Sequence, residues 1–149
     1  MQQQFITNSF EETQQIGENF AHLLEGGEIV ALYGDLGSGK TTFVQGLAKG
    51  LGITRNINSP TFIIAREYSI KNQESSIKEF VHIDLYRIES KKEVMNLGLS
   101  DLFNNSESVV AIEWAEKVRD LLPQKRIEVH FTYLEDDKRK IIIKTEEDL

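Results

Sequence analysis

Apolar residues recur every three or four positions in several stretches of the chain, which is the spacing of an amphipathic helix. The first stretch follows a Ser-x-x-Glu capping box at residues 9–12, and we expect its helix to run to the glycine pair at 26–27. A second helix is expected over 40–51. A third, over 115–122, is expected to end before a proline, and a second capping box lies at 90–93.

Short runs rich in apolar and β-branched residues predict strands. They lie at residues 28–33, 61–69, 80–86, 108–112, 126–134 and 139–145, and a first strand is expected to end at 6–7. The polar stretch 71–78 is short enough for a hairpin connection, and 135–138 predict the turn of a C-terminal hairpin. Strands that alternate with helices predict an α/β fold: a mixed sheet flanked by helices, with antiparallel additions including the C-terminal hairpin.

The composition is that of an ordinary globular protein and narrows the classes of function. The chain has 149 residues, 40% of them hydrophobic and 28% charged, which suits a single domain over 1–149. No apolar run approaches the roughly 20 residues of a membrane-spanning helix, and the first residues lack the pattern of a secretory signal. The absence of cysteine excludes disulfides, thiolate nucleophiles and cysteine-based zinc sites. We expect a cytoplasmic location and no membrane partner.

The net charge of −7 argues against a chain that grips nucleic acid by itself. Neutralised phosphates supply most of the affinity of such proteins, so autonomous binders are usually basic. We therefore expect no binding to DNA, and contact with RNA only through a local basic patch or a partner. The three histidines are far apart in the sequence and lack the spacing of a metal site.

The segment Gly34–Thr41 carries the strongest chemical signal, because it reads G-x-x-x-x-G-K-T. Its glycines let successive backbone N–H groups point at phosphate oxygens, and the following helix adds its positive N-terminal end. Lys40 can reach the β- and γ-phosphates, and the Thr41 hydroxyl can ligate Mg²⁺. A strand before the motif and a helix after it favour nucleotide binding over a glycine-rich turn that only caps a helix. The candidate binding residues are Asp35, Leu36, Gly37, Ser38, Gly39, Lys40 and Thr41.

Two acidic residues follow apolar strands and are candidates for the chemistry of hydrolysis. Asp84 ends the run 81–83, and Glu113 ends the run 109–112. The carboxyl ends of strands are where α/β sheets bind ligands, so both carboxylates are expected beside the phosphate loop. One division of roles gives Glu113 the metal and Asp84 the attacking water or a metal-bound water. The sequence leaves this assignment open. It also leaves open that either residue is only a solvent-exposed strand end with no part in hydrolysis.

Four further residues have two interpretations each. Thr61, after Ser-Pro, is either a switch residue near the γ-phosphate or the first residue of a strand. Trp114, the only tryptophan, is either a core anchor or a ring at the nucleotide or an interface. Arg87 is either a phosphate or partner contact or a surface residue at a strand end. His82 fits a satisfied histidine of the sheet better than a catalytic base.

Several short strings in a fixed order give the chain a family resemblance. They are GDLGSGKTT at 34–42, SPTF at 59–62, HIDLYR at 82–87, a glycine at 98 and EW at 113–114. The series resembles the TsaE (YjeE) family of small bacterial P-loop ATPases over about residues 28–114. The resemblance implies a P-loop NTPase-like fold.

The resemblance also implies a biological role that the residue pattern does not reach. TsaE proteins act in making threonylcarbamoyladenosine beside the anticodon of tRNA, together with TsaB and TsaD, and TsaD carries the transfer chemistry. ATP hydrolysis by TsaE is expected to reset the complex between cycles, with weak activity for the protein alone. The chain would then meet tRNA only through its partners. Thr61 matches a switch-like threonine of the family, and Trp114 matches a tryptophan important for activity.

The remaining site roles follow from the same resemblance. ATP and Mg²⁺ are the implied cofactors. Lys40 and Thr42 are implied to lie at the phosphates, and Thr41 and Glu113 at Mg²⁺. Asp84 is implied to act on water or on the metal.

Three other functions compete with this one. A small-molecule kinase needs an acceptor region and mobile arginines, and residues 86–101 offer little of either. A GTPase is disfavoured because the N-K-x-D string that reads guanine is absent. A non-catalytic nucleotide-binding module is the third. No residue type identifies the contacts to the base, although residues 9–13 and those after 132 are candidates by position.

Overall fold

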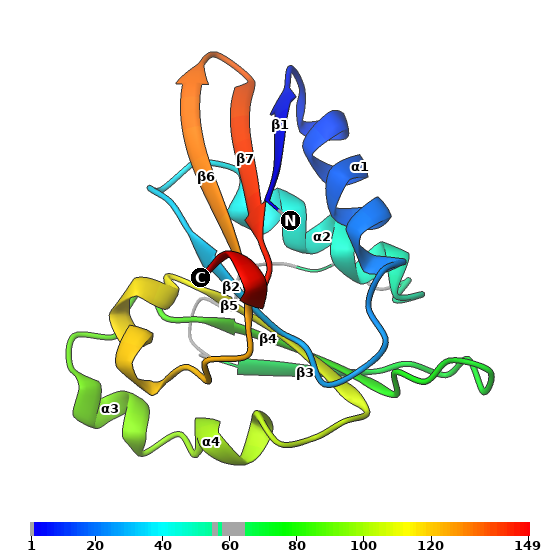
Figure 1. Ribbon diagram of the computed structural model, residues 1–149, viewed down its shortest axis with the longest axis vertical. Helices are drawn as coiled ribbons and strands as arrows, with labels where there is room; N and C mark the ends of the chain where they lie inside the picture. Colours follow the sequence, from blue (N-terminus) through cyan, green and yellow to red (C-terminus); the bar gives the residue numbers. More distant parts are fainter. Residues whose placement is uncertain (1, 55–56, 58–64) are drawn as a thin grey trace.

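The chain folds around one mixed sheet, shown in a computed structural model that describes residues 2–54, 57 and 65–149 (Figure 1). The strands are β1 (Gln3–Thr7), β2 (Ile29–Tyr33), β3 (Ala65–Ser69), β4 (Glu79–Asp84), β5 (Ser108–Glu113), β6 (Ile127–Glu135) and β7 (Lys138–Lys144). The α-helices are α1 (Phe10–Ala21), α2 (Lys40–Gly50), α3 (Lys91–Met95) and α4 (Leu99–Leu102), and the 3₁₀ helices are η1 (Ala115–Leu121) and η2 (Glu146–Asp148).

The centre of the sheet is parallel and its flanks are antiparallel. The strand order is β1-β7-β6-β2-β5-β4-β3. Strand β2 pairs in parallel with β5 and β6, and β4 pairs in parallel with β5. Antiparallel pairs add β3 to β4, β7 to β6 and β1 to β7. The predicted α/β fold, with a mixed sheet and a C-terminal hairpin, is therefore confirmed.

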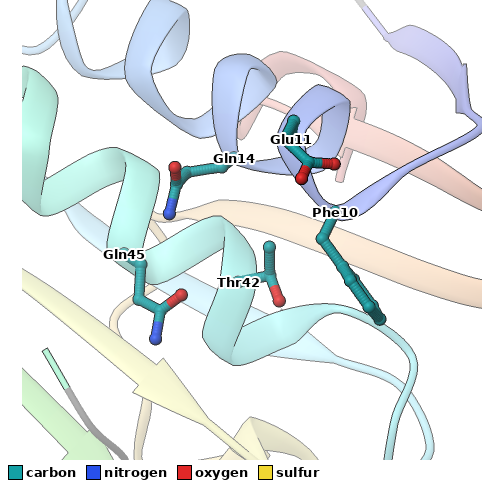
Figure 2. Close-up of a pocket in the computed structure, with 5 residues that line it drawn as sticks. All are labelled: Phe10, Glu11, Gln14, Thr42 and Gln45. Carbon is teal, nitrogen blue, oxygen red and sulfur yellow. The ribbon is translucent and has the colours of Figure 1, made fainter.

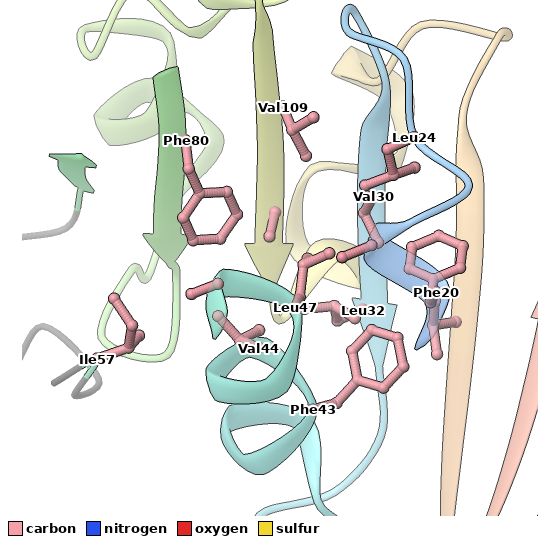
Figure 3. Packing of buried hydrophobic residues seen from close by; sticks show 14 of the residues in the cluster. Phe20, Leu24, Val30, Leu32, Phe43, Val44, Leu47, Ile57, Phe80 and Val109 are labelled. Carbon is pink, nitrogen blue, oxygen red and sulfur yellow. The ribbon is translucent and has the colours of Figure 1, made fainter. Parts of the chain in front are cut away.

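Helices cover both faces of the sheet because its central strands are apolar on both sides. All five residues of β2 are buried, as a strand between two helical layers requires. Helices α1 and α2 cover one face, where Phe43, Val44 and Leu47 pack against Val30 and other apolar side chains (Figure 3). Side chains of α3, α4 and η1 cover a second apolar cluster on the other face.

Helix α1 packs closely on α2, and glycines make this approach possible. A Cβ added at Gly46 would lie 1.9 Å from the Gln14 carbonyl oxygen, and one at Gly17 would lie 2.3 Å from the Phe43 carbonyl oxygen. Both obstacles are backbone atoms, so they have little freedom to move away. The close packing fixes the N-terminal end of α1 beside the N-terminal end of α2.

A buried polar cluster holds the end of β2, where the glycine-rich loop 34–39 begins. The Glu128 carboxylate, 4% exposed, accepts hydrogen bonds from the Tyr33 hydroxyl at 3.2 Å and from Arg126 Nε at 2.9 Å. His130 Nε2 lies 2.9 Å from the same carboxylate, and its ring stacks on Tyr33. The cluster joins the last residue of β2 to β6.

Some local predictions were wrong in extent. Helix α1 ends at Ala21, before the glycine pair, because the next backbone N–H groups bond three residues back and the chain tightens into turns. The predicted helix over 115–122 is the 3₁₀ helix η1, with a kink at Val118. The predicted strand over 61–69 is described only from Ala65, and its first residues lie outside the described part of the chain. Helix α4 was not predicted.

Within the described residues, no helix combines the length and apolar character needed to cross a membrane.

Candidate functional site

The loop between β2 and α2 adopts backbone conformations that glycine allows. Gly34, Gly37 and Gly39 have φ of 149°, 78° and 108°. At Gly34 an added Cβ would also lie 2.8 Å from the Phe131 carbonyl oxygen. Gly39 is the N-cap residue of α2 and has no side chain, so no side chain caps the first N–H groups of this helix. The loop thus forms the helix N-terminus that suits an anion.

The Lys40 side chain turns back into the loop. Its Nζ donates to the carbonyl oxygens of Gly34 and Asp35, and the residue is only 5% exposed. Burial lowers the pKa of Lys40, while the nearby carboxylates of Glu113 and Glu116 act in the opposite direction. A cation is therefore held inside the loop on backbone oxygens.

Thr41 and Glu113 place a hydroxyl and a carboxylate in contact at the start of α2. The Thr41 Oγ1 donates to Glu113 Oε1 at 2.9 Å, and Glu113 is 2% exposed at the end of β5. The second carboxylate oxygen, Oε2, lies 2.6 Å from His82 Nε2. The expected position of Glu113 beside the loop is confirmed, and so is its proximity to Thr41, which the family resemblance implied. Neither predicted the contact between Glu113 and His82.

The donor set here fits Mg²⁺ as nucleotide-binding proteins hold it. Mg²⁺ prefers oxygen ligands and is usually bound by one or two carboxylates or hydroxyls together with substrate phosphates. Thr41 and Glu113 supply a hydroxyl and a carboxylate beside the phosphate loop. Within residues 2–54, 57 and 65–149, no group of three or more His, Asp or Glu side chains is placed to hold a metal without such phosphates.

Asp84 lies in register with Glu113 at the same edge of the sheet. Its Oδ1 accepts a hydrogen bond from the Tyr86 backbone N–H at 3.0 Å, and the residue is half-buried. The two predicted carboxylates are therefore neighbours that differ in their surroundings. Glu113 is enclosed and contacts the loop helix, whereas Asp84 is more open.

Trp114 follows Glu113 in a backbone conformation that is rare for a large residue. Its φ is 62°, in the left-handed region. The ring packs beside Tyr86, with centroids 5.3 Å apart, and Lys40 Nζ lies 3.7 Å from its centre. It also packs against the apolar cluster on the η1 face. Its packing fits a core anchor, and its contact with Lys40 places the ring beside the loop; a role at the nucleotide or at an interface stays a prediction.

Arg139 reaches the loop from β7 and was missed in the sequence. Its Nε donates to the Gly37 carbonyl oxygen at 3.2 Å. The guanidinium also lies against the rings of Tyr133 and Phe10, at 4.8 and 5.9 Å. Strand alternation puts Arg139 on the same face as Ile141 and Ile143, so an arginine on an apolar face was the available signal.

A pocket of about 330 Å³ opens between the N-terminal parts of α1 and α2, next to the loop (Figure 2). Its lining is one aromatic ring and four polar side chains: Phe10, Glu11, Gln14, Thr42 and Gln45. Thr42, placed near the phosphates by family resemblance, faces this pocket. The candidate segment 9–13 for base contacts supplies two of the lining residues.

The other predicted residues are more dispersed. Leu36 is 73% exposed at the tip of the loop, whereas Ser38 is buried. Arg87 is exposed beyond the end of β4. Thr61 lies outside the described residues.

Comparisons with known proteins agree on one family. The model of a family described as "Threonylcarbamoyl adenosine biosynthesis protein TsaE" matches residues 7–141. Proteins named tRNA threonylcarbamoyladenosine biosynthesis protein TsaE are similar to the chain. The one from Bacillus subtilis is 41% identical over 131 residues, covering 88% of this chain and 78% of the relative. The one from Rickettsia bellii is 42% identical over 137 residues, covering 91% and 90%.

A solved structure has the same architecture. The crystal structure of YdiB from Bacillus subtilis superposes with a TM-score of 0.77 and 34% sequence identity. The match covers 97% of this chain and 86% of YdiB. The mixed sheet flanked by helices is thus a P-loop NTPase-like fold shared with a solved protein.

Proposed function

The chain belongs to the TsaE family, and we propose that it binds ATP and hydrolyses it with Mg²⁺ in the bacterial system that forms threonylcarbamoyladenosine next to the anticodon of tRNA. One observation carries the catalytic part of this proposal. The buried Lys40 ammonium and the Thr41–Glu113 pair meet at the N-terminus of α2, where a triphosphate and its metal need them.

Lys40 is proposed to exchange its present partners for phosphate oxygens. In the structure its Nζ donates to the Gly34 and Asp35 carbonyl oxygens, so it is already directed into the loop. Backbone N–H groups of the loop and of the first turn of α2 supply the other donors. Binding of the phosphates therefore needs movement of one side chain within a loop that is already formed.

Thr41 and Glu113 are proposed to hold Mg²⁺, which when bound neutralises charge that develops on the phosphates. Glu113 is favoured over Asp84 as the metal ligand because its carboxylate is buried and both of its oxygens are held in place by hydrogen-bond partners. Asp84 is proposed to orient the attacking water, because it lies in register with Glu113 and is more open to solvent. Thr61 is proposed as a switch residue on the strength of the family resemblance alone.

The polar pocket beside Thr42 is proposed to take the nucleoside. Its volume of about 330 Å³ is within the range of ligand pockets. Phe10 offers a ring face for a base, and Glu11, Gln14 and Gln45 offer hydrogen-bonding groups. A carboxylate can accept from the exocyclic amine of adenine, which is consistent with ATP.

The proposed partners are TsaB and TsaD, and hydrolysis is proposed to support cycling of their complex. The net charge of −7 supports indirect contact with tRNA, because the chain has no excess of cations to hold it. A partner-gated cycle would also allow another chain to supply an arginine that stabilises the transition state. We expect slow hydrolysis by the chain alone. Trp114, beside the site, and Arg87, exposed beyond the end of β4, are proposed to act in the complex.

The test is threonylcarbamoyladenosine formation on tRNA by a reconstituted system with TsaB and TsaD in limiting amounts. With the chain and ATP present, we expect many rounds of modification per complex. The Lys40→Ala variant serves as the matched control and is expected to support few. Equal product with and without the chain would contradict the proposal, and ATP consumption that depends on an added small acceptor would favour a kinase.

A further inference from the structure

His82 is a buried ionisable residue that the proposed reaction leaves unused. It is fully buried in β4, two residues before Asp84, and its ring lies parallel to Phe80 at 6.5 Å. Its Nε2 is 2.6 Å from Glu113 Oε2. Its other ring nitrogen, Nδ1, is buried without a hydrogen-bond partner among the described residues. A histidine that only filled space in the sheet would not need this orientation.

The hydrogen-bonding capacity of the Glu113 carboxylate determines which ring nitrogen of His82 is the donor. An ionised carboxylate only accepts hydrogen bonds, so Nε2 must carry the proton that is shared with Glu113. In the neutral ring, Nδ1 then carries the lone pair, and it is the nitrogen that is buried without a partner among the described residues. His82 therefore donates to Oε2, and Thr41 donates to Oε1.

We propose that His82 is a positioning residue that holds the Glu113 carboxylate with Oε1 directed at Thr41 and the metal position. This inference rests on the proposed function. With Oε2 tied to β4, rotation of the carboxylate group is restricted, and one oxygen is presented to the loop. The second partner of a metal-binding carboxylate typically contributes about 10- to 100-fold to metal affinity or activity.

The arrangement also joins two strands to the loop helix. His82 lies in β4, Glu113 in β5 and Thr41 in the first turn of α2. The chain of contacts His82–Glu113–Thr41 sets the position of the carboxylate relative to the helix whose N-terminus receives the phosphates. Loss of the His82 donor should therefore weaken the contribution of Mg²⁺ more than the contact of the nucleotide with the loop.

The experiment measures the affinity of the chain for a fluorescent ATP analogue, once with Mg²⁺ and once with EDTA. The ratio of the two affinities reports how much the metal tightens binding. We expect His82→Leu to lower this ratio about tenfold relative to the wild type. His82→Gln, whose side-chain amide can still donate, should restore most of it. Phe80→Leu, which alters packing on the same strand face, should leave the ratio unchanged.

The same measurements distinguish a positioning role of His82 from a purely structural one. If His82→Leu weakens binding equally in Mg²⁺ and EDTA, the role is structural and the inference is wrong. If His82→Leu does not fold, the pair His82→Gln and His82→Asn gives the same test. The shorter Asn side chain should lower the ratio and Gln should not, and equal ratios would overturn the inference. A wild-type chain that binds no nucleotide, or binds it without help from Mg²⁺, would instead overturn the proposed function.

Discussion

The ammonium group of Lys40 lies 3.7 Å from the centre of the Trp114 ring. Trp114 directly follows Glu113, so the residue after the end of β5 supplies the ring that contacts the lysine proposed to bind phosphate. Attraction between a cation and an aromatic face stabilises this arrangement, most strongly where water is excluded. The lysine proposed to move onto the phosphates thus starts in contact with the only tryptophan of the chain.

Removal of the Lys40 ammonium is expected to weaken nucleotide binding. Lys40→Ala deletes the cation enclosed by the loop, and we expect the affinity for ATP to fall at least tenfold, or about 1.4 kcal/mol. Titration with a fluorescent ATP analogue measures this. Lys49→Ala, an exposed position on the same helix, should bind as the wild type does. Unchanged affinity in Lys40→Ala would remove this residue from the phosphate site.

Trp114 is expected to matter more for activity than for folding. Trp114→Ala should lower ATP hydrolysis in the presence of TsaB and TsaD, while the chain still unfolds cooperatively in urea. Trp114→Gly should be more stable than Trp114→Ala by about 1 kcal/mol, because glycine adopts the φ of 62° without steric cost. If Trp114→Ala fails to fold, the core-anchor interpretation is the correct one.

The aromatic wall of the polar pocket is expected to contribute to binding of the nucleoside. Phe10 is 52% exposed although it is apolar, and its ring lines the pocket beside Arg139. We expect Phe10→Ala to weaken ATP binding by about 1 kcal/mol or more, since stacking of a base on an aromatic ring is worth about 1–3 kcal/mol. Inorganic triphosphate, which lacks a base, should bind the variant normally. An equal loss for both ligands would place the nucleoside elsewhere.

Glu128 is expected to make stability depend on pH in the acid range. Burial alone raises the pKa of Glu128, but hydrogen bonds from His130 and Arg126 outweigh it and hold the pKa below its usual value. The folded-state pKa is thus below the unfolded one. The stabilisation is fully present above the unfolded pKa of about 4.3 and is lost as pH falls through the folded pKa.

Urea unfolding of Glu128→Gln between pH 7 and pH 3 tests this expectation. The variant should be less stable near neutral pH by about 1–3 kcal/mol, because Arg126 loses its charged partner. Its free energy of unfolding should also fall less steeply with acid. Glu135→Gln, at an exposed position on the same strand, serves as the control. Parallel curves for the wild type and Glu128→Gln would show that this carboxylate does not titrate differently on folding.

Local sequence patterns predicted the strand and the helix on either side of the glycine-rich loop. The buried run of β2, the glycine spacing and the apolar side of α2 are all set within residues 28–51, so no distant contact is needed to find them. The two carboxylates were expected at the loop for a more general reason, that the carboxyl ends of parallel strands lie at one edge of a sheet. Asp84 and Glu113 are neighbours for that reason.

The contacts made across the fold were not predictable from the sequence. Arg139 touches Gly37 from 102 residues away because the C-terminal hairpin returns beside β2. His82 is the expected buried histidine of the sheet, but the identity of its hydrogen-bond partner, Glu113, depends on the pairing of β4 with β5. The early end of α1 at Ala21 was also missed, since the apolar spacing continues past it.

The most direct test is Mg²⁺-dependent ATP hydrolysis by the chain, alone and with TsaB and TsaD, compared with the Glu113→Gln variant. We expect slow turnover by the wild type alone, strong stimulation by the partners and no measurable stimulation of Glu113→Gln. Glu107→Gln, at an exposed position just before the other end of β5, should behave as the wild type does. Normal turnover by Glu113→Gln, or no stimulation of a wild type that binds ATP, would contradict the account.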